Sequence, residues 1–305
     1  MRLVFFGTPE FAVPSLAALH HAQFDIAAVV TQPDRPRGRS RSTVVAPPVK
    51  VIAEQLHLPV WQPERPRGGE FLDRIRAARA DLAVVVAYGH LLPAELLAIP
   101  RLGFVNVHAS LLPRWRGAAP IQWAILSGDA ETGVTIMRIE AGLDTGAVWL
   151  ERRAPIAPAD TAGSLAARLA ALGAEALLDA LPRIAAGEAP APQDEATAAH
   201  AAKVTRDLAR VDWRQPAREI ARLIRALDPA PGAWTTLRGE AVKLFAPAAP
   251  SHASFAQSGH AIWRNGELLI AAGNGAVSVG TVQPAGRRRM AAVEWVRGTA
   301  LDGLR

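Results

Sequence analysis

Two polar side chains interrupt a short apolar run that reads Phe104-Val105-Asn106-Val107-His108. Asn106 and His108 lie two residues apart, so on an extended strand they project from the same face. An amide beside an imidazole can stabilise a developing oxyanion and handle a proton. The alternative is that the two groups are buried and simply satisfy each other's hydrogen bonds, since buried polar groups need partners.

A third candidate, Asp144, lies in a tight loop between Gly142 and Gly146. In one interpretation its carboxylate accepts a hydrogen bond from His108 and tunes the protonation of the imidazole. In the other, Asp144 only caps the turn. Its position in the sequence leaves both interpretations open.

These candidates need a sheet to hold them, and the sequence predicts one. Apolar runs typical of buried strands alternate with helical patterns, which indicates an α/β fold with a doubly wound, mostly parallel sheet covered on both faces. The expected strands are 3–6, 24–30, a short strand and turn at 60–63, and then 82–87, 104–107, 134–139 and 147–154. The expected helices are 9–20, 48–56, 70–79, 94–98, 121–126 and 161–186. Ligands bind outside the carboxyl ends of such strands, where residues 88–89, 106–113 and 144 fall.

The first strand and helix are joined by Gly7-Thr8-Pro9, in which Thr8 is expected to cap the helix and Pro9 to occupy its first position. The GxGxxG fingerprint of dinucleotide-binding proteins does not follow this strand. We therefore assign no nucleotide to this turn.

The last third of the chain has a different pattern. Residues 187–202 are rich in Ala and Pro and are expected to be a linker. Beyond it, a helix at 216–227 and short alternating runs at 233–237, 242–245, 260–263, 268–271 and 277–282 predict a small β-barrel or sandwich. The expected domains are 1–186, with a basic insertion loop at 32–48, and 203–305.

Positive charge gathers in the C-terminal third. Residues 201–305 contain 15 Lys and Arg against 8 Asp and Glu, a net charge of +7, whereas residues 1–200 contain 19 against 20. Such asymmetry favours a module that meets a polyanion, with nucleic acid ahead of the alternative of ordinary solvated arginines. A basic run, Arg287-Arg288-Arg289, lies in this part.

A second basic feature is the insertion loop, in which Arg35, Arg37, Arg39 and Arg41 alternate with Pro, Gly and Ser. No core can form from this composition, so a mobile surface loop is expected. It either becomes ordered against phosphates or is a solvated insertion.

The chain of 305 residues contains no cysteine, which excludes disulfides and thiolate chemistry and suits a cytoplasmic protein. Its apolar runs are too short for a membrane span, and its N-terminus resembles a strand and not a signal peptide. We expect a cytoplasmic monomer.

Several motifs occur in an order that is typical of one enzyme family. They are Gly7-Thr8-Pro9, Thr31-Gln32-Pro33-Asp34-Arg35, Asn106-Val107-His108, Ser110-Leu111-Leu112-Pro113, Arg114-Trp115-Arg116-Gly117-Ala118-Ala119-Pro120-Ile121-Gln122, Gly142-Leu143-Asp144-Thr145-Gly146 and Gln283-Pro284-Ala285-Gly286. From residue 2 to about residue 290, they closely resemble the signature of the methionyl-tRNA formyltransferase family. The Asn, His and Asp set alone would resemble only the wider group of enzymes that use 10-formyltetrahydrofolate.

The resemblance implies a Rossmann-like formyltransferase domain, an OB-like second domain, and transfer of the formyl group of 10-formyltetrahydrofolate to the α-amino group of methionyl initiator tRNA. Asn106 and His108 would stabilise the developing oxyanion, and Asp144 would orient His108 and assist proton removal. The residues implied for folate are Ser110, Leu111, Leu112, Pro113, Val86, Ala87, Tyr88 and Gly89. Those expected to meet tRNA are Arg35, Arg37, Arg39, Arg41, Arg287, Arg288 and Arg289. No metal is expected.

Two alternatives stay open. One is a formyltransferase that acts on another amine, or a formyl-folate hydrolase, against which the basic C-terminal third counts. The other is a non-catalytic RNA-binding protein on an inherited enzyme fold, against which the presence of Asn106, His108 and Asp144 counts.

Overall fold

The structure is a computed structural model that describes residues 1–37, 43–253, 257–299 and 301. The chain forms two compact units, which are described separately. The first contains Met1–Gly117, Thr132–Ala154 and Ala166–His200, and the second contains Ala118–Glu131, Pro155–Leu165 and Ala201–Arg305. Two stretches that precede residue 166 therefore fold with the C-terminal part of the chain.

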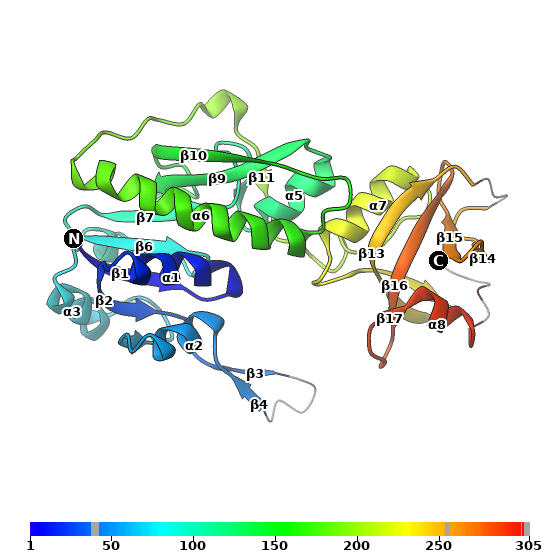
Figure 1. Cartoon of the computed structure of the whole chain (residues 1–305), viewed down its shortest axis with the longest axis horizontal. Helices are drawn as coiled ribbons and strands as arrows, with labels where there is room; N and C mark the ends of the chain where they lie inside the picture. The colour runs from blue at the N-terminus through cyan, green and yellow to red at the C-terminus, as the bar shows by residue number, and fades with distance from the viewer. Residues whose placement is uncertain (38–42, 254–256, 300, 302–305) are drawn as a thin grey trace. The chain divides into compact units, whose positions relative to one another are not determined.

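A seven-stranded sheet organises the first unit, in the order β10-β9-β7-β6-β1-β2-β5 (Figure 1). The strands are β1 (Arg2–Gly7), β2 (Asp25–Val30), β5 (Val60–Trp61), β6 (Leu82–Val86), β7 (Phe104–His108), β9 (Glu131–Arg138) and β10 (Val148–Pro155). The neighbours from β7 to β5 pair in parallel, and β9 pairs with β7 antiparallel. The strand order runs outward from β1 in both directions, which confirms the doubly wound, mostly parallel α/β sheet.

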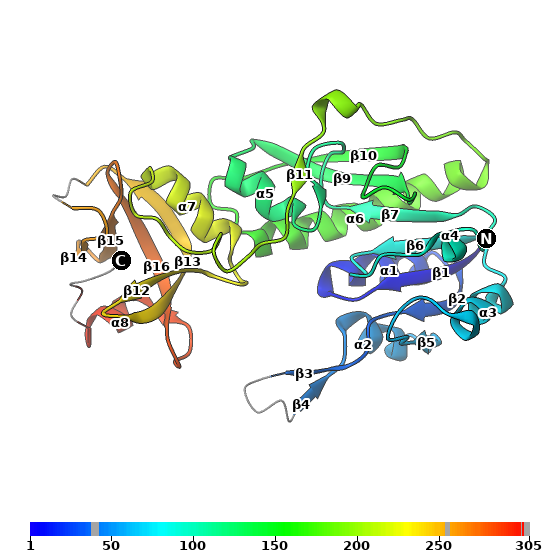
Figure 2. The same ribbon diagram turned by 180° about the vertical axis from the view of Figure 1, so that it is seen from behind.

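Helices cover both faces of this sheet. They are α1 (Val13–His21), α2 (Pro48–Gln55), α3 (Gly69–Ala78), α4 (Ala94–Leu97) and α6 (Ala162–Ala185), with short 3₁₀ turns at Glu10–Ala12 and Glu195–Thr197. Figure 1 looks onto the face with α1 and α6, and Figure 2 gives the opposite view. Among the described residues, no helix combines the length and apolarity that crossing a bilayer requires.

Close packing of α6 on β7 decides which way the polar residues of β7 point. Gly173 of α6 lies so near Val107 that an added Cβ would be 2.8 Å from Val107 Cγ1. Successive strand residues face opposite sides of a sheet. Asn106 and His108 therefore project from the face that α6 does not cover.

The expected helix cap at Thr8 is wrong. The chain passes through the 3₁₀ turn Glu10–Ala12 before α1, and no side chain caps either element. The Thr8 hydroxyl instead donates to the carbonyl oxygen of Tyr88 at 3.0 Å. Because Gly7 pairs with Val86, Thr8 lies beside Tyr88, and the hydroxyl bonds across the sheet and not along the helix.

The insertion at 32–48 has more regular structure than expected. Strands β3 (Arg35–Arg37) and β4 (Thr43–Val45) pair antiparallel. At its base, Asp34 accepts from Lys50 Nζ and Gln62 Nε2, both at 2.7 Å. Hydrogen bonds from Gln62 and Lys50 hold the pKa of Asp34 below its usual value. Backbone pairing and the contacts of Asp34 thus give the described part of the insertion regular structure without an apolar core.

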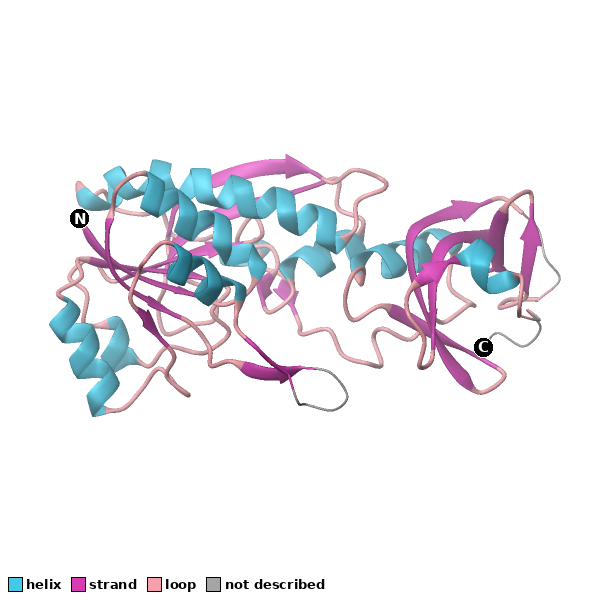
Figure 3. Cartoon of the chain, turned by 60° about the horizontal axis from the view of Figure 1, so that its bottom comes forward, coloured by secondary structure: helices cyan, strands magenta, loops and turns pink. Residues whose placement is uncertain are grey.

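The second unit is mostly β-structure (Figure 3). Its main sheet has the order β12-β13-β16-β15-β14, and β17 pairs with β16. Its elements are α5 (Pro120–Ser127), α7 (Ala217–Ala226), β12 (Ala233–Leu237), β13 (Glu240–Ser251), β14 (Ala261–Arg264), β15 (Glu267–Ala271), β16 (Ala276–Pro284), β17 (Met290–Ala291) and α8 (Ala292–Val296). The strands β8 (Arg116–Gly117) and β11 (His200–Ala201) form a separate short pair.

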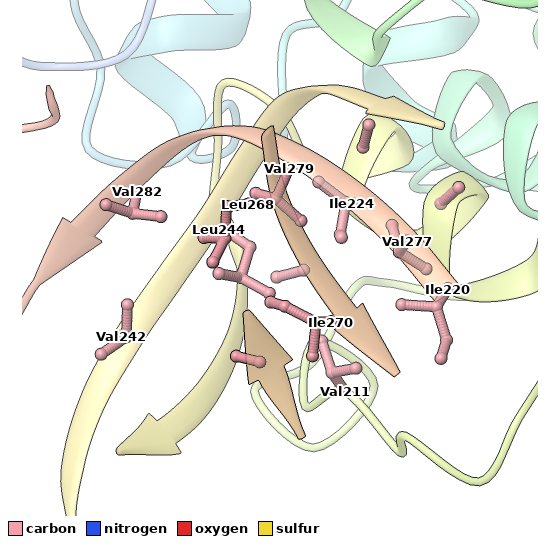
Figure 4. Packing of buried hydrophobic residues seen from close by; sticks show 14 of the residues in the cluster. Val211, Ile220, Ile224, Val242, Leu244, Leu268, Ile270, Val277, Val279 and Val282 are labelled. Carbon is pink, nitrogen blue, oxygen red and sulfur yellow. The ribbon is translucent and has the colours of Figure 1, made fainter. Parts of the chain in front are cut away.

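One apolar core fills the second unit (Figure 4). Ile220 and Ile224 of α7 point toward Leu244, Ile270 and Val277 of the strands, and all five are almost fully buried. The helix spacing of three to four residues brings the two isoleucines onto one face, which packs on the sheet. The small antiparallel β-domain that the alternating runs predict is confirmed.

Candidate active site

His108, at the carboxyl end of β7, is held by two neighbouring loops. Its ring is buried, and Nε2 lies 3.0 Å from the carbonyl oxygen of Trp115. A carbonyl oxygen can only accept, so Nε2 carries a hydrogen and donates it. The other ring nitrogen, Nδ1, then faces Asp144 Oδ2 at 3.7 Å.

Asp144 lies in the loop between β9 and β10 with a φ of +53°, in the left-handed region that few non-glycine residues adopt. Its Oδ2 accepts a hydrogen bond from the backbone N–H of Gly117 at 2.9 Å. The distance of 3.7 Å to His108 is too long for a direct hydrogen bond but short enough for strong attraction to a protonated imidazole. Asp144 thus anchors a turn and also faces the imidazole.

Asn106 is half-buried beside these groups. His108 directs its two nitrogens to Trp115 and Asp144, so Asn106 and His108 do not satisfy one another. In the part of the chain that the structure describes, the Asn106 amide has no hydrogen-bond partner. A half-buried amide without a partner among the described residues is available to an oxygen of a bound ligand.

The turn Ser110-Leu111-Leu112-Pro113 is fixed by internal hydrogen bonds. Ser110 Oγ donates to the carbonyl of Arg114 at 2.6 Å, and Thr135 Oγ1 donates to the carbonyl of Ser110 at 2.7 Å. Ser110 and Leu112 are buried, whereas Leu111 and Pro113 are partly exposed. This turn therefore offers Leu111 and Pro113 to a ligand.

At the end of β6, the stretch Val86-Ala87-Tyr88-Gly89 alternates between buried and exposed residues. Val86 and Tyr88 are buried, and the Tyr88 ring packs edge-on against Phe6 with centroids 5.4 Å apart. Burial raises the pKa of the Tyr88 phenol to about 12. Ala87 and Gly89 are exposed and can meet a ligand with their backbone.

The predicted arginines fall into three groups. Arg35 is exposed and donates to Gln32 Oε1 at 2.6 Å, and Arg37 belongs to β3. Arg39 and Arg41 lie outside the described residues. Arg287 and Arg288 are exposed, but Arg289 is bound to the buried carboxylate of Asp228 by two hydrogen bonds of 2.8 and 2.9 Å and lies 4.0 Å from the centre of the Phe245 ring.

Comparison with known proteins identifies the relatives of this chain. The model of the formyl transferase family matches residues 1–181, and that of the formyl transferase C-terminal domain matches residues 203–300. Methionyl-tRNA formyltransferase of Methylococcus capsulatus is 48% identical over 310 residues, which cover 100% of this chain and 99% of the relative. The enzyme of Thiobacillus denitrificans is 47% identical, with 99% and 98% covered. This chain belongs to the methionyl-tRNA formyltransferase family.

Several solved structures share the fold of this family member. Methionyl-tRNA formyltransferase from Clostridium thermocellum aligns with a TM-score of 0.58 and 13% identity, covering 92% of this chain and 98% of that one. HypX from Aquifex aeolicus, in complex with tetrahydrofolic acid, aligns with a TM-score of 0.70 and 22% identity, covering 99% of this chain and 48% of that one. A sugar 3N-formyl transferase, WlaRD, aligns with a TM-score of 0.68 and 18% identity, covering 94% and 99%. At these identities the likeness concerns the fold.

Three residues of this formyltransferase site were not among the sequence predictions. The side chain of Arg116 is only 3% exposed, and it binds Gln193 and Glu195 in the stretch expected to be a linker. Gln193 in turn donates to the carbonyls of Asp144 and Gly146, at 2.9 and 2.7 Å. Nothing in the sequence of the Ala- and Pro-rich stretch indicates that its residues bind Arg116.

The residues at this site suit a formyl donor. The unpartnered Asn106 amide is a hydrogen-bond donor, His108 offers Nδ1, and Asp144 adds a carboxylate that faces Nδ1. Such a set suits acyl transfer through an oxyanion. Among the described residues, no group of three or more His, Cys, Asp and Glu side chains is arranged to hold a metal ion.

Proposed function

We propose that this chain transfers the formyl group of 10-formyltetrahydrofolate to the α-amino group of methionyl initiator tRNA, which yields N-formylmethionyl-tRNA for translation initiation. The observation that carries this proposal is the 48% identity, over the full length of both chains, with a methionyl-tRNA formyltransferase. The arrangement of Asn106, His108 and Asp144 supports the same chemistry.

In the proposed reaction, the bound folate supplies a formyl carbon already activated as an amide. The amine nitrogen bonds to this carbon, the bond from the carbon to the folate nitrogen breaks, and negative charge develops on the formyl oxygen. Asn106 donates its amide N–H to that oxygen. Because Asn106 makes no competing hydrogen bond to the described residues, this donor needs no rearrangement before the reaction.

His108 and Asp144 handle the proton. The methionyl amine must lose a proton as its nitrogen bonds to carbon, and the folate nitrogen must gain one. Since Nε2 of His108 is bound to the Trp115 carbonyl, the basic nitrogen is Nδ1. The carboxylate of Asp144, 3.7 Å away, stabilises the protonated ring, either directly or through a water that contacts both groups.

We propose that folate contacts the exposed members of the two predicted stretches, namely Leu111, Pro113, Ala87 and Gly89. Ser110, Leu112, Val86 and Tyr88 support these residues from beneath. For tRNA, the basic insertion at 32–48 and the exposed Arg287 and Arg288 supply positive charge. Residues 201–305 carry a net charge of +7, in keeping with this role. Arg289 supports the same surface through Asp228.

We also propose that the protein acts in the cytoplasm as a monomer. The absence of cysteine suits a reducing compartment. Asn106, His108 and Asp144 all come from one unit of one chain, so the proposed site needs no second copy. Light scattering of the purified protein tests the monomer.

The deciding experiment is single-turnover formyl transfer from 10-formyltetrahydrofolate. Charged initiator methionyl-tRNA, charged elongator methionyl-tRNA and free methionine are compared as acceptors. Transfer confined to the initiator tRNA is expected. Release of formate without transfer to any of the three would instead point to a hydrolase or to another amine, an alternative that the full-length relatives do not favour.

A further inference from the structure

We propose that Gln193 is a positioning residue that holds the loop of Asp144 in its active conformation, with Arg116 and Glu195 as its support. This inference rests on the proposed role of Asp144 in formyl transfer. It concerns the stretch 187–202, for which the sequence suggests only a linker.

The loops beside His108 hold two residues in a conformation that needs external support. Asp144 has a φ of +53° and Trp115 a φ of +64°, both in the left-handed region. Such backbone is unfavourable for a non-glycine residue and persists only when the surroundings enforce it. These two residues supply the groups that face the two nitrogens of His108, the Trp115 carbonyl and the Asp144 carboxylate.

Gln193 stabilises this backbone conformation at Asp144 with two hydrogen bonds. Its Nε2 donates one hydrogen to the carbonyl of Asp144 at 2.9 Å and the other to the carbonyl of Gly146 at 2.7 Å. Its Oε1 accepts from Nε and Nη2 of Arg116 at 2.9 and 2.7 Å. The orientation of the amide follows from these partners, because carbonyls only accept and a guanidinium only donates. Gln193 thereby uses both of its donors and both acceptor sites.

Gly146 lets the loop that binds Gln193 lie close against β9. An added Cβ on Gly146 would collide with the carbonyl of Arg138, so only glycine allows the loop to lie this close to β9. The two carbonyls that bind Gln193 are those of residues 144 and 146, on either side of Thr145. The amide therefore spans the turn that carries the Asp144 carboxylate.

Arg116 transmits this support to the other side of the site. It lies directly between Trp115, which binds His108, and Gly117, whose N–H binds Asp144. The Arg116 guanidinium also pairs with both oxygens of Glu195, at 2.7 and 2.8 Å. These hydrogen bonds raise the pKa of Arg116. Residues 193–195 thus join the loop after β7 to the loop after β9.

The test compares two variants of the full-length protein with wild type. In Gln193→Glu, the side chain still accepts from Arg116 but can no longer donate to the carbonyls of Asp144 and Gly146. In the control variant Glu188→Ala, Gln193 and all its partners remain, and the lost carboxylate is 45% exposed and pairs with Arg183. Formyl transfer to charged initiator tRNA is measured as kcat and KM across pH, together with hydrogen exchange of the Gly117 amide, which donates to Asp144.

For Gln193→Glu we expect kcat to fall by up to ~10²-fold, because Asp144 is misplaced, and KM for the formyl donor to change little. The pH profile of kcat should change, and the Gly117 amide should exchange faster. Glu188→Ala is expected to stay close to wild type in kcat. Gln193→Met, which lacks a charge, repeats the test if the glutamate disturbs folding. Wild-type values of kcat, pH profile and exchange in both Gln193 variants overturn the positioning role and leave the proposed function standing. A wild-type protein that transfers no formyl group overturns the proposed function, and the positioning role with it.

Discussion

His108 donates its Nε2 hydrogen to the carbonyl oxygen of Trp115 at 3.0 Å. This one contact assigns the tautomer, because a neutral imidazole that donates from Nε2 must carry its lone pair on Nδ1. Nδ1 is the nitrogen that faces Asp144. The carbonyl of Trp115 therefore directs the lone pair of His108 toward the carboxylate of Asp144.

Replacing Asn106 with Ala should lower kcat by about 10²–10³-fold, because the developing oxyanion loses a preorganised donor. KM for the formyl donor should change far less. The measurement is steady-state transfer to charged initiator tRNA, with thermal unfolding as the control for folding. Turnover close to wild type in a folded variant would exclude Asn106 as the oxyanion donor.

Replacing Asp144 with Asn separates the charge of this residue from its anchoring role. The Asn oxygen can still accept from the Gly117 N–H, so the turn should persist. Loss of the charge that stabilises protonated His108 should reduce kcat by about 10²–10⁴-fold and change the pH profile of kcat. If the variant only loses thermal stability and keeps its rate, Asp144 is a turn cap.

Arg287 and Arg288 should contribute to tRNA binding through phosphate contacts. Replacing Arg288 with Ala should weaken binding and reduce the slope of log K against log salt by about 1. Point substitution is a cleaner test than truncation near residue 203, because α5 packs against α7 within the second unit and would lose that cover. An unchanged salt slope would remove Arg288 from the interface.

The neighbouring Arg289 should behave differently. Replacing it with Ala leaves the buried carboxylate of Asp228 with the backbone N–H of Ala246 as its one hydrogen-bond donor among the described residues. We expect a loss of about 1–3 kcal/mol in the free energy of unfolding, measured by urea denaturation. Arg288→Ala is the matched control, with an expected change within about 0.5 kcal/mol. Equal effects of the two substitutions would contradict a special role for the pair.

Tyr88 is the only tyrosine of the chain, so its ionisation can be followed directly by ultraviolet absorbance. Burial raises the pKa of its phenol to about 12, whereas an unfolded tyrosine titrates near 10. The folded state therefore favours the neutral phenol, and its contribution to stability is complete below pH ~10 and is lost as the pH rises toward 12. A native midpoint near 10 would show that the ring is more accessible than its burial indicates.

Sequence patterns predict the central sheet of this protein well, because buried strands consist of apolar runs. The run at 82–87 and the run at 104–107 both become strands of the parallel sheet. Hydrogen bonds of single side chains are harder to predict. The Thr8 hydroxyl could accept from a backbone N–H of the helix or donate to a carbonyl, and the pairing of β1 with β6 brings the Tyr88 carbonyl within reach.

The contact between Gln193 and Arg116 could not be predicted from the sequence for a similar reason. Gln193 and Arg116 are 77 residues apart, and neither belongs to a periodic pattern. Nor does any apolar residue in 187–202 indicate that this stretch returns to the sheet. Pairs of this kind depend on the tertiary arrangement and carry no local signature.

The contacts of Gln193 also have a consequence for synthesis on the ribosome. Asn106, His108 and Asp144 leave the exit tunnel well before residues 193–195, so a nascent chain can hold all three side chains while the Asp144 turn still lacks its amide partner. A catalytic fragment cut at residue 181, where the match to the first family model ends, would remain in that unfinished state. Any minimal formyltransferase made from this chain must therefore extend past Glu195.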